Sequence, residues 1–254
     1  MLLLNALIFL RGDYRASYYE LCLRILSDLR EAEELLSHTR RSPRGRLRVS
    51  APTALATNFL IPALPQFFRR FPEIMLDLSS SDRPVDLIED GFDCAIRGGE
   101  LADSSLTAGR IATVHFATCA APEYLAQYGT PQHPSDLERH VCVNFISSKT
   151  GKYYEWDFTK DGTVLRVPMT AAIAVSDMNA YTEAALAGLG CAQLTDFSAR
   201  AHLKSGRLVR VLHDWVIPPV PVHVVYPLNR HLSAKVGVFT EWLAEIGATG
   251  VAAD

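Results

Sequence analysis

Residues 45–79 read GRLRVSAPTALATNFLIPALPQFFRRFPEIMLDLS, and this stretch decides the expected fold. We predict a strand over 47–51, a helix over 53–70 that is interrupted or restarted at Pro62, and a second strand over 74–79. Because a strand–helix–strand connection crosses over in the right-handed sense, the two strands should be parallel neighbours. The expected architecture is therefore an α/β sheet with room for a ligand at the carboxyl ends of its strands.

The alternation of strands and helices continues toward the end of the chain. Further strands are expected over 92–96, 111–120, 141–145, 164–168, 171–175, 191–195 and 222–226. Further helices are expected over 85–90, from Pro122 to about 128, over 177–187 and over 233–246. Gly188 and Gly190 follow a predicted helix instead of opening one, which favours a helix C-cap over a phosphate-binding loop. A second α/β lobe follows from this pattern.

A heptad seam precedes the first strand. Between residues 17 and 37 apolar side chains recur in steps of 4, 3, 4, 3 and 4, at Tyr18, Cys22, Ile25, Leu29, Ala32 and Leu36. So narrow a stripe is typical of a two-helix coiled coil, although an amphipathic helix lying on its own domain is the alternative. Ser-Pro-Arg-Gly at 42–45 then ends the helix. We expect residues 1–44 to hold a dimerisation linker helix and residues 45–254 to form a separate domain.

Composition describes an ordinary globular protein with an uneven charge. The 254 residues carry a net charge of -3, but residues 1–48 hold nine Arg against six acidic residues, which leaves -6 for the rest. The arginines at 40, 41, 44, 46 and 48 suit either phosphate contact or a solvated linker. Five cysteines without a CxxC pair indicate a reducing compartment, and no apolar run approaches a membrane span. We therefore expect a cytoplasmic protein without a membrane partner.

Motifs for catalysis and cofactors are missing. The sequence has no GxSxG, HExxH or Walker-type loop, and His140 with Cys142 offers too few ligands for a metal site. Polar groups instead follow predicted strands: Thr53 at a helix start, Ser81 after the second strand, and Arg97 after the third. Free helix N–H groups and a guanidinium fork suit an anion. The alternatives are a plain helix N-cap at Thr53 and a surface salt bridge at Arg97.

Several motifs occur in a fixed order along the chain. They are GRLRVSAP at 45–52, FDCAIRG at 92–98, Ser105-Leu106, APEYL at 121–125, ALAGLG at 185–190 and VVYP at 224–227. Together they resemble the effector (substrate-binding) domain of LysR-type transcriptional regulators, from about residue 17 to 247. No single motif is specific, but their order and spacing are.

The resemblance implies a two-lobed, periplasmic-binding-protein-like (type 2) α/β domain preceded by a linker helix. The first lobe would comprise residues 46–118 plus 224–250 and the second residues 119–222, joined by two crossing strands. A small anionic effector, a carboxylate or aromatic acid, would bind between the lobes and change how a homodimer or homotetramer holds DNA. The residues expected to contact the effector are Thr53, Ser81, Arg97, Phe145, Ser176, Asp177 and Thr195.

DNA contact in this family is made by a winged helix–turn–helix ahead of the linker. Residues 1–16 show no such pattern, so we expect DNA binding only through a domain that this chain lacks. One alternative is a solute-binding protein of the same fold, which would need a cleavable signal where the heptad seam stands. The other is an enzyme, for which Asp177 is the one tempting catalytic group, although a helix N-cap explains it more simply.

Overall fold

The computed structural model describes residues 18, 22, 43–99, 106–148, 150–227 and 233–250. The chain divides into two units, Met1–Pro43 and Arg44–Asp254. In the first unit Tyr18 and Cys22 are helical. The other seam positions, Ile25, Leu29, Ala32 and Leu36, lie outside the described residues, so the coiled coil stays a prediction.

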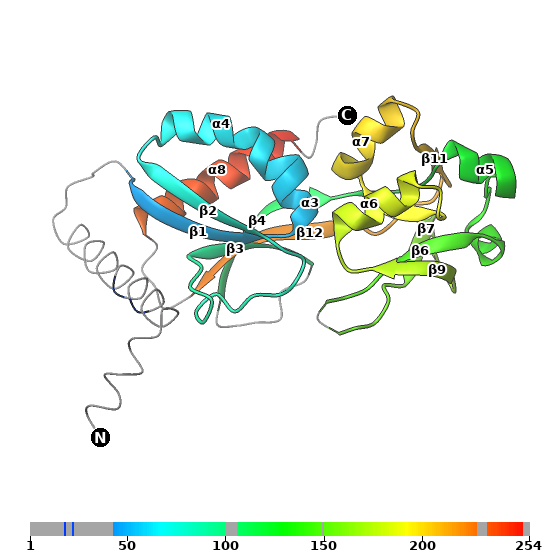
Figure 1. The fold of residues 1–254 in the computed structure, drawn as a ribbon, viewed down its shortest axis with the longest axis horizontal. Helices are drawn as coiled ribbons and strands as arrows, with labels where there is room; N and C mark the ends of the chain where they lie inside the picture. The colour runs from blue at the N-terminus through cyan, green and yellow to red at the C-terminus, as the bar shows by residue number, and fades with distance from the viewer. Residues whose placement is uncertain are drawn as a thin grey trace, which may run out of the picture. The chain divides into compact units, whose positions relative to one another are not determined.

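The second unit begins with a five-stranded sheet (Figure 1). Its strands are β1 (Gly45–Ala51), β2 (Ile74–Ser80), β3 (Cys94–Gly98), β4 (Leu106–Val114) and β12 (Val220–Pro227). They lie in the order β2-β1-β3-β12-β4. β1 runs parallel to β2 and β3, whereas β12 runs antiparallel to β3 and β4. The parallel pair predicted from residues 45–79 is confirmed.

The connection between β1 and β2 is a continuous helical run. It comprises α3 (Thr53–Leu55), the π-helical turn η1 (Ala56–Leu60) and α4 (Ile61–Arg70). The α geometry resumes at Ile61, beside Pro62, where the sequence predicted a restart. Pro62 has no N–H to donate to the preceding turn, and the run departs from α geometry in the π-helical turn just before it.

One face of this sheet carries α4 and α8 (Ala234–Gly250) (Figure 1). Phe67 of α4 lies 5.5 Å from Phe239 and 4.9 Å from Trp242 of α8, measured between ring centroids. All three rings are fully buried, so this aromatic cluster fixes both helices on the sheet. The predicted helix over 85–90 is wrong: residues 87–91 form turns. The Asp86 carboxylate accepts the amides of Ile88 and Glu89 and its carbonyl accepts the Asp90 amide, but Gly91, with φ of +71°, ends this single turn before a helix forms.

Among its described residues, the second lobe holds three smaller sheets and four short helices. The sheets are β10 (Ala192–Thr195), β5 (Phe116–Ala120) and β11 (Val209–Val211); β6 (Val141–Phe145) and β9 (Thr170–Val175); and β7 (Trp156–Lys160) and β8 (Thr163–Val167). The helices are α5 (Pro122–Tyr128), η2 (Pro134–Arg139), α6 (Met178–Leu186) and α7 (Asp196–Lys204). Four of these elements, β7, β11, η2 and α7, were not predicted from the sequence.

The predicted strand over 111–120 is divided at His115. Its first half belongs to β4 in the first sheet, and its second half is β5, which pairs with β10 and β11 of the second lobe. The chain crosses back before β12, which pairs with β3 and β4. The exact division into 46–118 plus 224–250 and 119–222 stays a prediction, but two strand crossings link the sheets.

The end of α6 confirms the predicted C-cap at Gly188, whereas Gly190 packs against the backbone of β6. After the C-cap residue Ala187, Gly188 has φ of +72° and its N–H donates to the Ala185 carbonyl. The N–H of Leu189 donates to the Ala184 carbonyl. A left-handed residue after a helix favours glycine, because other residues have a Cβ clash there.

Candidate functional site

Two helices begin on opposite sides of the junction between the lobes. The first is the run that starts at Thr53 after β1, and the second is α6, which starts at Met178 after β9. Asp177 caps α6: its carboxylate accepts the Ala180 amide at 2.8 Å, as the N-cap reading predicted. Pro52 occupies the N-cap position before Thr53 and provides no side-chain cap. The amides of Thr53 and Met178 therefore have no acceptor within their own helices.

The carboxylate of Asp82 joins these two amides. Its Oδ1 accepts the Thr53 N–H at 3.0 Å, and its Oδ2 accepts the Met178 N–H at 2.9 Å. Both donors are at helix N-termini, where the helix dipole favours negative charge. We call this pair of amides the carboxylate site. It spans the two lobes and is matched to one planar carboxylate.

A further contact ties Asp82 to the second lobe. The Ser148 hydroxyl donates to the backbone carbonyl of Asp82 at 2.6 Å. Asp82, Ser148 and Met178 were not among the residues predicted from the sequence. Asp82 follows the predicted Ser81 directly, so a polar residue after the second strand was the available signal. The donor at Met178 is a backbone N–H, which no residue type reveals.

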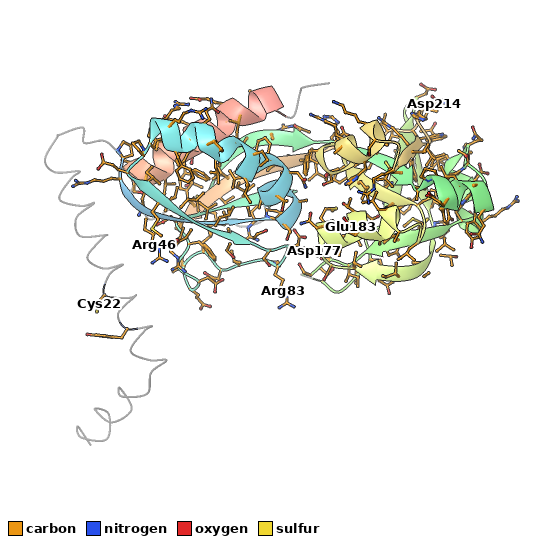
Figure 2. The ribbon with its side chains drawn as sticks, turned by 45° about the horizontal axis from the view of Figure 1, so that its top comes forward. Cys22, Arg46, Arg83, Asp177, Glu183 and Asp214 are labelled. Carbon is orange, nitrogen blue, oxygen red and sulfur yellow. The ribbon has the colours of Figure 1, made fainter. Side chains whose placement is uncertain are left out.

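Four of the predicted residues lie next to the carboxylate site along the chain. Thr53 contributes its amide, Ser81 precedes Asp82, and Ser176 and Asp177 precede Met178. The Ser81 N–H donates to the Ala51 carbonyl and its hydroxyl accepts the Arg83 amide, so Ser81 holds the turn that presents Asp82. Asp177 lies at the junction of the lobes, and Arg83 points away from the ribbon (Figure 2).

Arg97 acts on the segment that follows Asp82. Its Nη2 donates to the Val85 carbonyl at 2.6 Å, and no ion pair joins it to another described residue. Burial lowers the pKa of Arg97, because removal from water disfavours the charged guanidinium. The contact with Val85 anchors the segment from Asp82 to Val85 against β3.

Phe145 and Thr195 lie apart from the hydrogen bonds of Asp82. The Phe145 ring packs against Tyr154 at 5.8 Å and against Tyr181 at 5.6 Å, measured between centroids. The Thr195 hydroxyl is buried and donates to the Ser198 hydroxyl at 2.8 Å. Phe145 thus belongs to an aromatic cluster at the end of β6, and Thr195 forms the start of α7.

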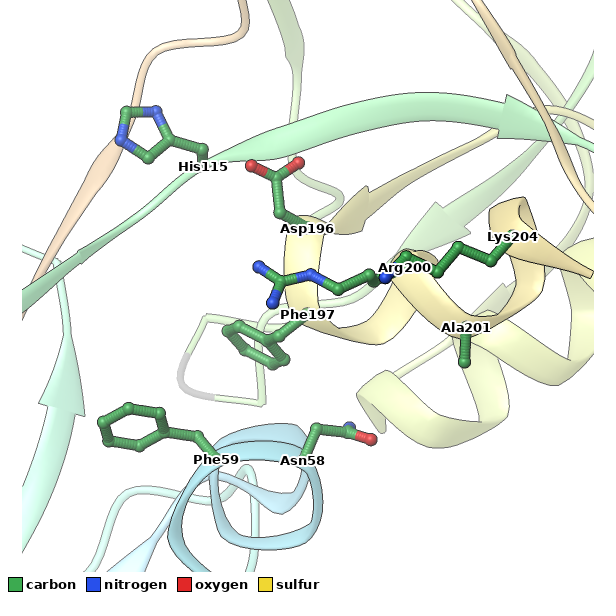
Figure 3. Close-up of a pocket in the computed structure, with 8 residues that line it drawn as sticks. All are labelled: Asn58, Phe59, His115, Asp196, Phe197, Arg200, Ala201 and Lys204. Carbon is green, nitrogen blue, oxygen red and sulfur yellow. The ribbon is translucent and has the colours of Figure 1, made fainter. Parts of the chain in front are cut away.

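A cavity of about 320 Å³ lies between η1, α7 and the crossing strand (Figure 3). It is lined by Asn58, Phe59, His115, Asp196, Phe197, Arg200, Ala201 and Lys204. None of the seven predicted effector residues lines it. Figure 3 shows the Arg200 guanidinium beside the Phe197 ring, with Phe59 and Asn58 on the opposite wall. The cavity is therefore distinct from the carboxylate site.

The histidine and cysteine side chains that could have bound a metal have structural roles among the described residues. His140 Nδ1 lies 3.2 Å from the Tyr124 hydroxyl, and the Cys142 thiol is buried, which raises its pKa. Within the part that the structure describes, no three His, Cys, Asp or Glu side chains gather as a metal site. All five cysteines are free thiols. No helix among the described residues is long and apolar enough to cross a membrane.

Residues 40–248 match the family model of the LysR substrate-binding domain. The chain belongs to the LysR-type transcriptional regulators. The HTH-type transcriptional regulator YhjC of Escherichia coli is 35% identical over 230 residues, which cover 91% of this chain and 77% of the relative. An HTH-type transcriptional repressor of Pseudomonas aeruginosa is 34% identical over 233 residues, which cover 92% of this chain and 74% of the relative.

Solved LysR-type regulators share the fold. The structure of CrgA from Neisseria meningitidis superimposes with a TM-score of 0.73 at 28% identity, covering 93% of this chain and 80% of CrgA. The CrgA regulatory domain superimposes with a TM-score of 0.72 at 30% identity, covering 80% of this chain and 98% of that domain. The predicted type 2 fold is confirmed. Because the relatives are named transcriptional regulators, this LysR-type chain has a regulatory and not a catalytic role.

Proposed function

We propose that the effector of this regulator is an organic carboxylate that binds between the lobes at the carboxylate site. The observation that carries the proposal is the pair of amides at Thr53 and Met178, which hold the Asp82 carboxylate at 3.0 and 2.9 Å. Two helix N-termini that converge on one carboxylate supply both hydrogen bonds and a favourable field for an anion. The same donors suit the carboxylate of a small molecule.

The remaining predicted residues fit the proposal in different ways. Ser81, Ser176 and Asp177 would line the polar end of the effector, and Arg97 would fix the segment that carries Asp82. Phe145 and its exposed neighbour Tyr154 offer aromatic surface at the end of β6, whereas its other neighbour, Tyr181, is buried. An aromatic acid would use both the carboxylate site and these rings. Thr195, whose hydroxyl donates a hydrogen bond to Ser198, would stabilise the start of α7 in the second lobe.

An effector that bonds to both amides stabilises one arrangement of the lobes. A ligand shifts such an equilibrium only by binding one state more tightly than another, and contacts to both lobes provide that difference. We propose that the change is passed to a homodimer or homotetramer joined through the heptad seam, and from there to a winged helix–turn–helix on the DNA. Free thiols at all five cysteines support a cytoplasmic location.

The decisive experiment removes one donor without changing a side-chain charge. Thr53→Pro deletes the amide N–H at a first helical position, which proline tolerates, and Pro52 already has the extended conformation (φ -57°, ψ 142°) that a residue before proline adopts. Thr53→Ala keeps the N–H and removes the hydroxyl. The two variants therefore separate the backbone donor from the side chain.

The readout is a thermal-shift screen of aliphatic and aromatic acids, followed by calorimetry of the strongest acid. Both variants are compared in an Asp82→Ala background, because Asp82 accepts the same Thr53 amide and its loss of a hydrogen bond would offset that of the acid. There we expect Thr53→Pro to weaken binding of the acid by about tenfold or more, the effect of losing one charge-assisted hydrogen bond. Thr53→Ala should bind within about threefold of Asp82→Ala alone, because the amide remains. Unchanged affinity in Thr53→Pro would show that the anion is bound elsewhere, for example in the cavity beside Arg200.

A further inference from the structure

We infer that Asp82 is a built-in ligand of the carboxylate site: it holds the lobes together without an effector, and an effector carboxylate binds by displacing it. This inference rests on the proposed function and deepens it, because it names the group with which the effector competes. The displacement breaks and forms only hydrogen bonds. Asp82 would therefore set how tightly an effector binds, and it would select effectors that carry a carboxylate.

The first support is that the Asp82 carboxylate accepts hydrogen bonds from both amides, as the carboxylate of a bound ligand would. Each carboxylate oxygen accepts one amide, at 3.0 Å from Thr53 and 2.9 Å from Met178. Met178 lies 96 residues further along the chain, on the opposite lobe. A second carboxylate cannot accept the same two hydrogen atoms while Asp82 does. Binding of an effector to these amides and their binding to Asp82 are therefore mutually exclusive.

The second support is that the shorter polar contacts between the lobes converge on Asp82. Besides the bond to Met178, its backbone carbonyl accepts the Ser148 hydroxyl at 2.6 Å. The side-chain contacts of η1 with the second lobe are longer: Asn179 to Thr57 is 3.5 Å, and Asn58 to Ser198 is also 3.5 Å. Such distances are at the limit of a hydrogen bond. Release of the Asp82 carboxylate would remove the bond to Met178 and leave the Ser148 contact, which is made to the backbone.

The third support is the position of Asp82 in the chain. Residues 81–86 belong to neither a helix nor a strand, so the Asp82 side chain can swing away without breaking the sheet. The segment is held at both ends, by the Ser81 N–H on the Ala51 carbonyl and by Arg97 on the Val85 carbonyl. A displaced Asp82 would stay close to the site, where it competes as an intramolecular group.

The inference predicts that removal of the Asp82 carboxylate creates an empty site for the smallest carboxylates. In Asp82→Ala both part-buried amides lose their protein acceptor, which is unfavourable to the extent that water does not replace it. Formate and acetate should then bind and restore the thermal stability that the substitution removes. The parent should respond to them much less, because its own carboxylate occupies the amides.

The test compares the parent chain, Asp82→Ala and Glu89→Ala by thermal shift and calorimetry with sodium acetate and sodium formate. Sodium chloride at equal ionic strength controls for screening. Glu89 is an exposed carboxylate close by in the chain, so its variant carries the same charge change. We expect Asp82→Ala to bind acetate saturably, at least about tenfold more tightly than the parent or Glu89→Ala. Adding Met178→Pro to Asp82→Ala should abolish the gain, whereas adding Met178→Ala should not.

Equal acetate binding in the parent and Asp82→Ala, or no binding in either, would overturn the inference. If Asp82→Ala does not fold, Asp82→Asn replaces it: its side chain has one acceptor oxygen for the two N–H groups and no charge, so acetate should still bind it more tightly than the parent. The two proposals fail in different ways. An organic acid that loses affinity in Thr53→Pro but is indifferent to Asp82→Ala would leave the proposed effector site standing and refute the role of Asp82. If acetate rescues Asp82→Ala but no organic acid binds to the parent, the role of Asp82 stands and the proposed effector is refuted.

Discussion

Gly190 provides a sharp test of how the second lobe is packed. It lies between α6 and β10 with φ of +148°. A Cβ at this position would lie 2.4 Å from the Val141 oxygen, 2.8 Å from the Val141 carbonyl carbon and 3.2 Å from Cys142 Cα. All three atoms are backbone of β6, which cannot swing aside as a side chain would. Gly190→Ala should therefore separate the two segments.

The cost follows from the contacts at that point. Cys191 N–H donates to the Val141 carbonyl at 3.0 Å, and Val143 N–H donates to the Cys191 carbonyl at 2.8 Å. Loss of both bonds costs about 1 kcal/mol each. A non-glycine residue in this backbone region adds about 1–3 kcal/mol. The free energy of unfolding should fall by about 3–5 kcal/mol, which for a chain of this size lowers Tm by roughly 6–20 °C.

Gly188→Ala is the matched control. Gly188 also has a positive φ, +72°, but a Cβ there would meet no atom within 4 Å. Only backbone strain remains, about 1–2 kcal/mol. Thermal and urea unfolding of the two variants, followed by circular dichroism, give the comparison. Equal losses of stability in Gly188→Ala and Gly190→Ala would refute the close approach of Gly190 to β6.

Three further predictions concern local contacts and assembly. Asp177→Ala removes the cap on the Ala180 amide and should cost about 1 kcal/mol in urea unfolding, whereas Asp177→Asn should restore most of it; equal losses would argue against capping. The amide of His133, above all, holds the pKa of Asp136 below its ordinary value, so Asp136 stabilises the fold above about pH 3.9 and this contribution is lost as pH falls through the lower folded value. Unfolding of Asp136→Asn should accordingly be less sensitive to acid than that of the parent, and parallel pH profiles would contradict this. Leu29→Glu should weaken self-association in light scattering, because it puts a charge in the predicted seam; a parent that is strictly monomeric would contradict the seam.

Local signals explain what could be predicted of the fold. The parallel pair of β1 and β2, the cap at Asp177 and the C-cap at Gly188 depend on residues that are close in sequence. The missed helix α7 and the misassigned turn at 87–91 show the limit. At 86–91 the Asp86 carboxylate caps a single turn as it would cap a helix, and Gly91 ends that turn, so the local signals for a helix are present although no helix forms.

The sequence by itself determined the class of domain and its family, because the order of the motifs and the alternation of strands and helices can be recognised without any long-range contact. Thr53 could be chosen from its place at a helix start. Only the tertiary structure decided that the Thr53 amide meets a second helix start at Met178, and that Asp82 lies between them. These groups are 29 and 96 residues from Asp82 along the chain. Two of the three partners are backbone N–H groups, which every residue but proline carries, so their convergence depends on how the strand crossings place the lobes and on nothing written in a side chain.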